Sequence, residues 1–243
     1  MNYRIIAFFL IIGGISGVGF CQEAPLSDLV VEENIKGTTL NKDGQVHFEA
    51  KKALFNKSDM TLEMQDDVKI ETQEGLRLET DAIKWNQNND KVFTDQRVKI
   101  TKQEELQIEG RGLDAKPSLK RAKIEEEVEV RIPQEDSTFI MITCNGPLEI
   151  DYQEGVAVFY NDVRVNQKDS QLFSDKATMY FDLNTRSIDK IVAEGNVRII
   201  RGKDTSYSEK ATYDPAKKKV VLEGSPRLVI FPDEDQDKTM GFP

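Results

Sequence analysis

Alternating apolar and polar positions dominate the chain beyond its first twenty residues. In "DDVKIET" the apolar Val68 and Ile70 flank the charged Lys69, and the same order recurs at Val98 in "QRVKITK" and at Val128 in "EEVEVRI". A period of two is typical of β-strands with one buried face. Because the three valines lie thirty residues apart, the pattern also indicates a repeated strand unit.

The second half of the chain continues this pattern at a longer interval. Val163 in "NDVRVNQ" and Val197 in "GNVRIIR" lie thirty-four residues apart, and the phrases "SDKATMY" and "SEKATY" repeat each other. No stretch beyond the N-terminal segment has an apolar stripe of helical period and length. The sequence therefore predicts an all-β stack of antiparallel strand pairs in two facing sheets, with apolar side chains inside and charges outside.

The stretch "IVAEGNVRII" interrupts its own alternation at Gly195, between Glu194 and Asn196. Glycine inside a strand usually marks a bulge or a sharp bend. We therefore expect the long strand to kink there, so that the chain passes around the edge of the stack. The phrase "EGSP" at residues 223–226 repeats the device, and its proline indicates a position near a sheet edge because proline removes a ladder donor.

Counting along the repeats assigns the interior positions of the stack. In most proteins such residues form a packed core, but in a stack that does not close they also line a groove. The predicted interior residues are Val68, Ile70, Leu78, Val98, Ile100, Ile108, Val128, Val130, Phe159, Val163, Val165, Phe173, Met179, Val197, Ile199 and Tyr207.

The charge balance argues against nucleic acid as a partner. The formal net charge is -10, and 31% of the 243 residues are charged. Lysine and arginine are interleaved with acidic residues nearly everywhere, whereas a phosphate-binding surface needs a basic face.

The first residues of the chain are typical of an export signal. After one arginine, an uncharged run extends from Ile5 to Phe20, which is shorter than the roughly 20 apolar residues that cross a bilayer comfortably. A cleaved signal peptide is therefore favoured, and a retained membrane anchor is the alternative. Cys21 suggests lipidation, although the bulky Phe20 precedes it; otherwise it is an incidental cysteine.

The sequence offers little for catalysis, a metal or a cofactor. His47 is the only histidine, which excludes His-pair metal sites and weakens nucleophile–histidine schemes. Carboxylates such as Glu125, Glu127 and Glu129 fall at outward positions, as expected for a soluble exterior. The other cysteine, Cys144, is interpreted as a small buried residue or an unpaired thiol. We predict no catalytic residue, no metal site and no cofactor.

Two stretches resemble a known family. "DAIKWNQNNDKVFTDQRVKI" followed by "IEGRGLDA" resembles the LptC family of lipopolysaccharide-export proteins, and "VAEGNVRI" resembles the related LptA/OstA-like domain. The resemblance covers roughly residues 40 to 232. It implies an open, taco-shaped β-jellyroll whose apolar interior carries lipopolysaccharide acyl chains across the periplasm. It also implies end-to-end docking of such domains into a bridge fed by an inner-membrane ABC transporter.

The resemblance, together with a break in the pattern at residues 132–138 around Pro133, divides the chain. The expected parts are a signal peptide or membrane anchor over 1–21, an LptC-like half over 22–132, an LptA/OstA-like half over 139–232 and an acidic tail over 233–243.

The function that the resemblance implies is that of a non-enzymatic lipopolysaccharide carrier in the periplasm, either free or anchored in the inner membrane. Acyl chains would gain roughly 0.8 kcal/mol per methylene buried among the interior residues. Leu228, Val229 and Ile230 belong to a last repeat that nothing covers, so they are the predicted docking edge for another jellyroll protein. A structural β-solenoid scaffold without lipid and an exported polysaccharide-active enzyme remain as alternatives.

Overall fold

The computed structural model describes residues 28–231, except 42–43, 104–105, 118–119, 135–136, 184–186 and 218. The expected signal or anchor over 1–21 and the acidic tail over 233–243 lie outside the described residues. In the part that is described, no helix is long and apolar enough to cross a membrane.

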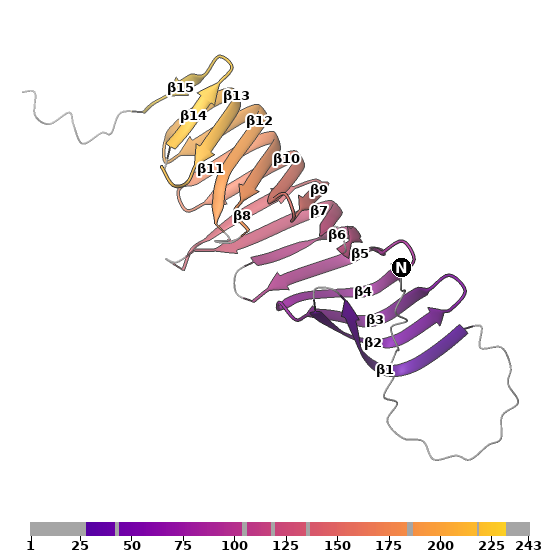
Figure 1. The fold of residues 1–243 in the computed structure, drawn as a ribbon. Helices are drawn as coiled ribbons and strands as arrows, with labels where there is room; N and C mark the ends of the chain where they lie inside the picture. Colours follow the sequence, from indigo (N-terminus) through magenta and orange to yellow (C-terminus); the bar gives the residue numbers. More distant parts are fainter. Residues whose placement is uncertain are drawn as a thin grey trace, which may run out of the picture.

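Within the described residues fifteen strands form one antiparallel sheet, and Figure 1 shows them side by side along the molecule, from β1 at one end to β15 at the other. The strands are β1 (Asp28–Asn41), β2 (Gly44–Asn56), β3 (Thr61–Thr72), β4 (Leu76–Asn86), β5 (Lys91–Lys102), β6 (Leu106–Lys116), β7 (Arg121–Pro133), β8 (Phe139–Cys144), β9 (Leu148–Asp151), β10 (Val156–Gln167), β11 (Ser170–Phe181), β12 (Ile188–Arg201), β13 (Asp204–Asp214), β14 (Lys219–Glu223) and β15 (Arg227–Val229). The predicted all-β class is confirmed.

Two pairs of short strands are the halves of interrupted long ones. β8 and β9 both pair with β7 on one side and β10 on the other, while β14 and β15 both pair with β13. Each strand otherwise pairs with its neighbour in sequence. The result is an open β-jellyroll that grows by one hairpin after another.

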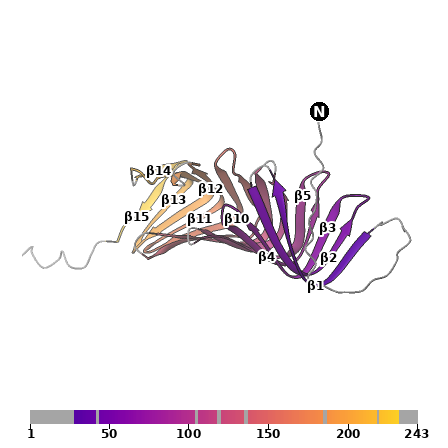
Figure 2. The same cartoon turned by 60° about the horizontal axis from the view of Figure 1, so that its bottom comes forward.

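The long strands bend near their middle, and the bends give the sheet its two walls (Figure 2). The pairing register shifts at each bend, as between Glu194 and Val197 in β12. Gly195 and Asn196 have positive φ angles of 77° and 48° there, and Asp66 and Asp67 of β3 have 62° and 54°. Such bulges increase the local twist and redirect the strand. The kink predicted at Gly195 is confirmed.

The "EGSP" phrase interrupts the last strand as predicted. Gly224 and Ser225 have positive φ angles of 77° and 53°, and Pro226 directly precedes β15. β15 pairs with β13 only, so the phrase lies at the end of the sheet.

The core lies between the two walls and thins toward the C-terminal end. One buried cluster extends in sequence from Ile35 to Met179, whereas a separate small cluster contains only Ala193, Val197 and Ala211. Because alanine contributes little apolar area, the walls at this end are less well filled.

The expected break at residues 132–138 overlaps the end of β7, which extends to Pro133, and β8 begins at Phe139. The two strands pair directly, with Val128 opposite Cys144 and Pro133 opposite Phe139, so the sheet continues through the expected seam. The boundaries of the two halves stay a prediction.

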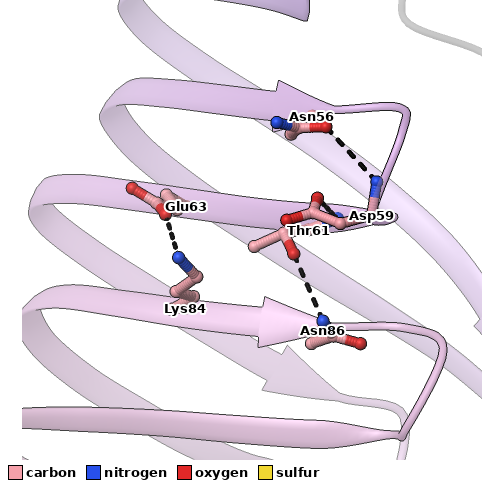
Figure 3. Close-up of polar contacts among 6 residues, drawn as sticks. All are labelled: Asn56, Asp59, Thr61, Glu63, Lys84 and Asn86. Carbon is pink, nitrogen blue, oxygen red and sulfur yellow. Dashed lines mark hydrogen bonds and ion pairs between the residues drawn. The ribbon is translucent and has the colours of Figure 1, made fainter.

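Asparagine and aspartate side chains close several hairpins at the rim. Asn56 Oδ1 accepts hydrogen bonds from the backbone N–H groups of Ser58 and Asp59, at 2.9 and 3.3 Å, and Asn86 repeats the arrangement at the end of β4. Figure 3 shows this rim, where Asn86 Nδ2 also donates to Thr61 Oγ1 at 3.4 Å. Such side-chain turns explain why the repeats end in these residue types.

Candidate apolar groove between the two walls

On the inner face of one wall, residues that pair across neighbouring strands form a continuous row. We call this row the inner row. Each member stands opposite the next on the neighbouring strand, so the row crosses the whole sheet. It contains Gly37, Phe48, Ile70, Leu78, Ile100, Ile108, Val130, Ile142, Val165, Leu172, Ile199, Ser206 and Leu228.

Exposure along the inner row increases toward the C-terminal end. Leu78 and Val130 are buried, with 7% and 4% of their surface accessible, whereas Leu172 and Ile199 are half-buried and Leu228 is 59% exposed. Ile70 and Ile100 are half-buried as well, but only in the last third of the sheet, from Val165 on, is every member of the inner row half-buried or exposed.

A second row lines the opposite wall, on the other side of the bends. It passes through Leu62, Trp85, Val92, Ala115, Ala122, Ile150, Ala157, Met179, Ile191, Tyr213 and Val220. The two rows share the inner face, so the space between them is bounded by apolar side chains from both walls.

The structure divides the predicted interior residues into two groups that share the inner face. The half-buried group, which a ligand can reach, is Ile70, Ile100, Val165 and Ile199. The buried group, which forms the core, is Val68, Leu78, Val98, Ile108, Val128, Val130, Phe159, Val163, Met179 and Val197.

Phe173 and Tyr207 were assigned to the wrong face. Phe173 stands opposite Arg164 and Arg198, and Tyr207 stands opposite Arg198 and Arg227. Their neighbours Leu172 and Ser206 occupy the inner row, and successive strand residues point to opposite faces.

The cause of this error is a second kind of bend. In β10 and β12 the inner positions on either side of the bend are four residues apart, as between Ala193 and Val197 of β12, so parity is kept. In β11 the corresponding step is three, from Ser174 to Ala177, so parity changes. Leu172 was therefore missed; the repeated phrase "DKA" and "EKA" before the alanine was the available signal.

Two polar side-chain atoms in the described residues are buried without a hydrogen-bond partner, namely Trp85 Nε1 and Ser208 Oγ. Trp85 belongs to the second row, and Ser208 stands opposite Val197 on the inner face. A buried polar group without a partner is costly, so both positions suit a ligand that brings an acceptor.

Cys144 and His47 have ordinary structural roles. Cys144 is buried and unpaired, and burial raises the pKa of its thiol, so it remains protonated and inert. His47 is exposed on β2, with Nδ1 at 2.9 Å from Thr38 Oγ1. Among the described residues no group of three histidine, cysteine or acidic side chains is placed to hold a metal ion.

A hollow of about 510 Å³ lies on the charged side of the sheet rather than in the groove. Its lining includes Asp67, Asp81, Arg97 and Lys99, which carry charges of both signs. Such a lining does not suit an acyl chain, because charged groups would lose their hydration.

The three residues of the predicted docking edge are exposed. Leu228 is 59% exposed, Val229 38% and Ile230 63%, and the following Phe231 is 55% exposed. Large apolar side chains gathered at the end of a sheet mark an interaction site more often than an ordinary surface. The docking role itself stays a prediction.

Fold and groove together define an open β-jellyroll with an apolar inner face. Residues 30–132 match the family described as "Lipopolysaccharide-assembly, LptC-related", and residues 146–241 match the family described as "LptA/(LptD N-terminal domain) LPS transport protein". A similar solved structure is that of LptH from Pseudomonas aeruginosa, described as the LptA homologous periplasmic component of the lipopolysaccharide transport device. The likeness has a TM-score of 0.44 at 13% identity and covers 52% of this chain and 95% of that one. No curated protein matches.

The chain thus belongs to the lipopolysaccharide-transport families, with an LptC-related region followed by an LptA/LptD N-terminal region. The two family descriptions name assembly and transport of lipopolysaccharide.

Proposed function

We propose that this protein carries lipopolysaccharide across the periplasm without chemical change, as one component of a bridge from an inner-membrane ABC transporter to the outer membrane. The acyl chains lie between the two walls, against the half-buried inner residues Ile70, Ile100, Val165 and Ile199. Burial of each methylene contributes roughly 0.8 kcal/mol, so affinity comes from shielding.

The observation that carries this proposal is the inner row. An apolar surface that continues from strand to strand suits a long hydrocarbon chain, because the ligand can slide without meeting a charged group. The inner row holds no charged residue from Gly37 to Leu228, and all of its members from Val165 on are half-buried or exposed. A scaffold without lipid would have no need of an accessible apolar row.

Photocrosslinking from adjacent residues of β12 tests the proposal. Ile199 lies on the inner face, opposite Leu172 and Ser206, whereas Ile200 lies on the outer face, opposite Gln171 and Thr205. A photoreactive residue at 199 is expected to form a crosslink with lipopolysaccharide in living cells, and one at 200 is not. Equal crosslinking at both positions, or none at 199, would argue for the scaffold alternative.

The partner at the C-terminal end is another jellyroll protein of the bridge, which adds a strand to the open end beside β15. Leu228, Val229 and Ile230 form this docking edge. The first strands, at the other end of the sheet, face the transporter. The N-terminal segment either anchors the protein in the inner membrane or is removed.

Replacing Leu228 with aspartate tests the docking edge. Leu228 is 59% exposed, so the midpoint of thermal unfolding is expected to stay within about 2 °C. Capture of the next bridge protein should fall at least tenfold, because a carboxylate would be buried in the joint. Gln153→Asp, in an exposed turn, is the matched control. Unchanged capture by the Leu228 variant would place the docking site elsewhere.

A further inference from the structure

The outer face of the sheet carries a second continuous row, which we call the outer row. From β2 to β15 it takes one residue from each strand that it crosses, directly beside the inner row but on the opposite face. Its members are Glu49, Lys69, Glu79, Lys99, Glu109, Glu129, Thr143, Arg164, Phe173, Arg198, Tyr207 and Arg227.

The two ends of the outer row have different chemistry. The N-terminal part alternates glutamate with lysine as far as Glu109 and ends with a second glutamate, Glu129. From Arg164 on, the C-terminal part alternates arginine with an aromatic residue. The guanidinium carbon of Arg198 lies 4.2 Å from the ring centroid of Phe173, and that of Arg227 lies 4.7 Å from the ring of Tyr207. A guanidinium stacked on a ring keeps its N–H edge free for a carboxylate.

The side chains of the outer row, read from the N-terminal end, are complementary in charge and type to the same side chains read from the C-terminal end. Its midpoint falls between Glu129 of β7 and Thr143 of β8, with an equal number of its members on either side. Neighbouring strands are spaced by about 4.8 Å throughout a sheet. A twofold rotation about an axis parallel to these strands therefore brings the row of a second copy into step with the first.

In that arrangement three of the six pairs join opposite charges, and no two like charges meet. Arg227 stands opposite Glu49 of the other copy, Arg198 opposite Glu79, and Arg164 opposite Glu109. Two further pairs join a lysine to an aromatic ring, Lys69 with Tyr207 and Lys99 with Phe173, which is a favourable cation–π combination. The central pair is Glu129 with Thr143, which is neutral toward the contact.

We propose that two copies of this chain associate through the outer row as an antiparallel, twofold symmetric dimer, a property that goes beyond the proposed carrier function. The contact is isologous, so each pair forms twice and the assembly closes at two subunits. The groove stays free, because the inner row lies on the opposite face.

A further row on the outer face lies two residues along each strand from the outer row, and it fits the same arrangement. The same rotation places no two like charges opposite each other there. The resulting pairs are His47 with Val229, Glu71 with Thr205, Arg77 with Ile200, Thr101 with Gln171, Gln107 with Asn166 and Arg131 with Met141.

The ion pairs that the row makes within one chain do not prevent association. Arg164 contacts Asp162 at 2.7 Å and Glu49 contacts Lys36 at 2.8 Å, but these side chains are about half exposed or more. Exposed pairs of this kind contribute little to stability, so they can be exchanged for contacts that the partner shields from water. The dimer should weaken with salt, since its contacts are charged.

Complementary charge reversal tests the dimer by sedimentation of the full chain. One variant carries Glu49→Arg, Glu79→Arg and Glu109→Arg; the other carries Arg164→Glu, Arg198→Glu and Arg227→Glu. Each is expected to be monomeric alone because like charges now meet, while an equal mixture forms the dimer, since both contacts are opposite again. All proteins also carry Leu228→Asp, so that end-to-end association does not contribute.

The alternative occupant of the arginine part is an anionic membrane surface, and vesicles of phosphatidylglycerol serve as its probe. A dimeric parent, two monomeric variants and a dimeric mixture support the proposal, with circular dichroism verifying that each variant is folded. A monomeric parent, a variant that still dimerises, or a mixture that stays monomeric overturns it. Binding of a monomeric parent to the vesicles, lost on reversal of the arginines, would assign the row to the membrane instead.

Discussion

Replacing Val98 with aspartate is expected to lower the free energy of unfolding by about 3–5 kcal/mol, the range for a buried charge without a partner. Val98 is 3% exposed on β5, between Thr80 of β4 and Gly110 of β6 on the inner face. Neither of these neighbours is a cation that could pair with the new carboxylate. Denaturant unfolding followed by circular dichroism measures the loss.

The matched control is Thr101→Asp on the same strand. Thr101 lies on the outer face opposite Arg77 and Gln107, where a carboxylate stays hydrated and has a cation beside it. Its unfolding free energy should change by less than about 0.5 kcal/mol. Similar losses for the two variants would mean that the inner and outer faces of β5 are assigned wrongly.

The fold class followed from the sequence because both repeats and alternation were visible. Val68, Val98 and Val128 recur at a fixed interval with charged neighbours, and only strands bury every second residue in this way. The kink at Gly195 was equally visible, since glycine interrupts an otherwise regular strand. Its positive φ angle of 77° is the conformation that glycine adopts at least cost.

The groove was only partly predictable, because parity depends on bends that leave a weak signal. Strands whose inner positions are four residues apart at the bend keep parity, and there the assignments hold, as for Ile199. In β11 and β13 the step is three residues, so Phe173 and Tyr207 face outward with the arginines. A bulge of one residue reverses every assignment beyond it, and the repeated phrase "DKA" or "EKA" is the one local feature noted above that β11 and β13 share at this step.

Accessibility could not be predicted from the pattern at all. Val163 and Val165 occupy equivalent positions two residues apart in β10, yet Val163 is fully buried and Val165 is half-buried. The difference depends on distance from the bend, where the walls come together, and on the alanines that thin the C-terminal core. Both are properties of the assembled sheet rather than of any one strand.

Gly146→Ala is expected to destabilise the protein by about 3 kcal/mol or more, at the upper end for local backbone strain. Gly146 separates β8 from β9 and has a positive φ angle of 104°, outside the region that alanine adopts readily. A Cβ atom there would also lie 2.1 Å from the backbone carbonyl oxygen of Glu125. The clash is with backbone of β7, which is held by pairing on both sides, so neither partner can move without disturbing the sheet.

Gly202→Ala separates the two contributions. Gly202 also has a positive φ, 58°, but a Cβ atom there would meet nothing within 4 Å. Its loss should be limited to about 1–2 kcal/mol, the cost of a left-handed alanine. Thermal and denaturant unfolding of both variants measure the difference, and the excess for Gly146 is the steric clash together with the additional cost of its φ angle, which lies beyond the left-handed helical region. If both alanine variants lost the same small amount of stability, the backbone around Gly146 would not be held rigidly against β7. Hydrogen exchange at β7 would then show whether the strand is free to move away.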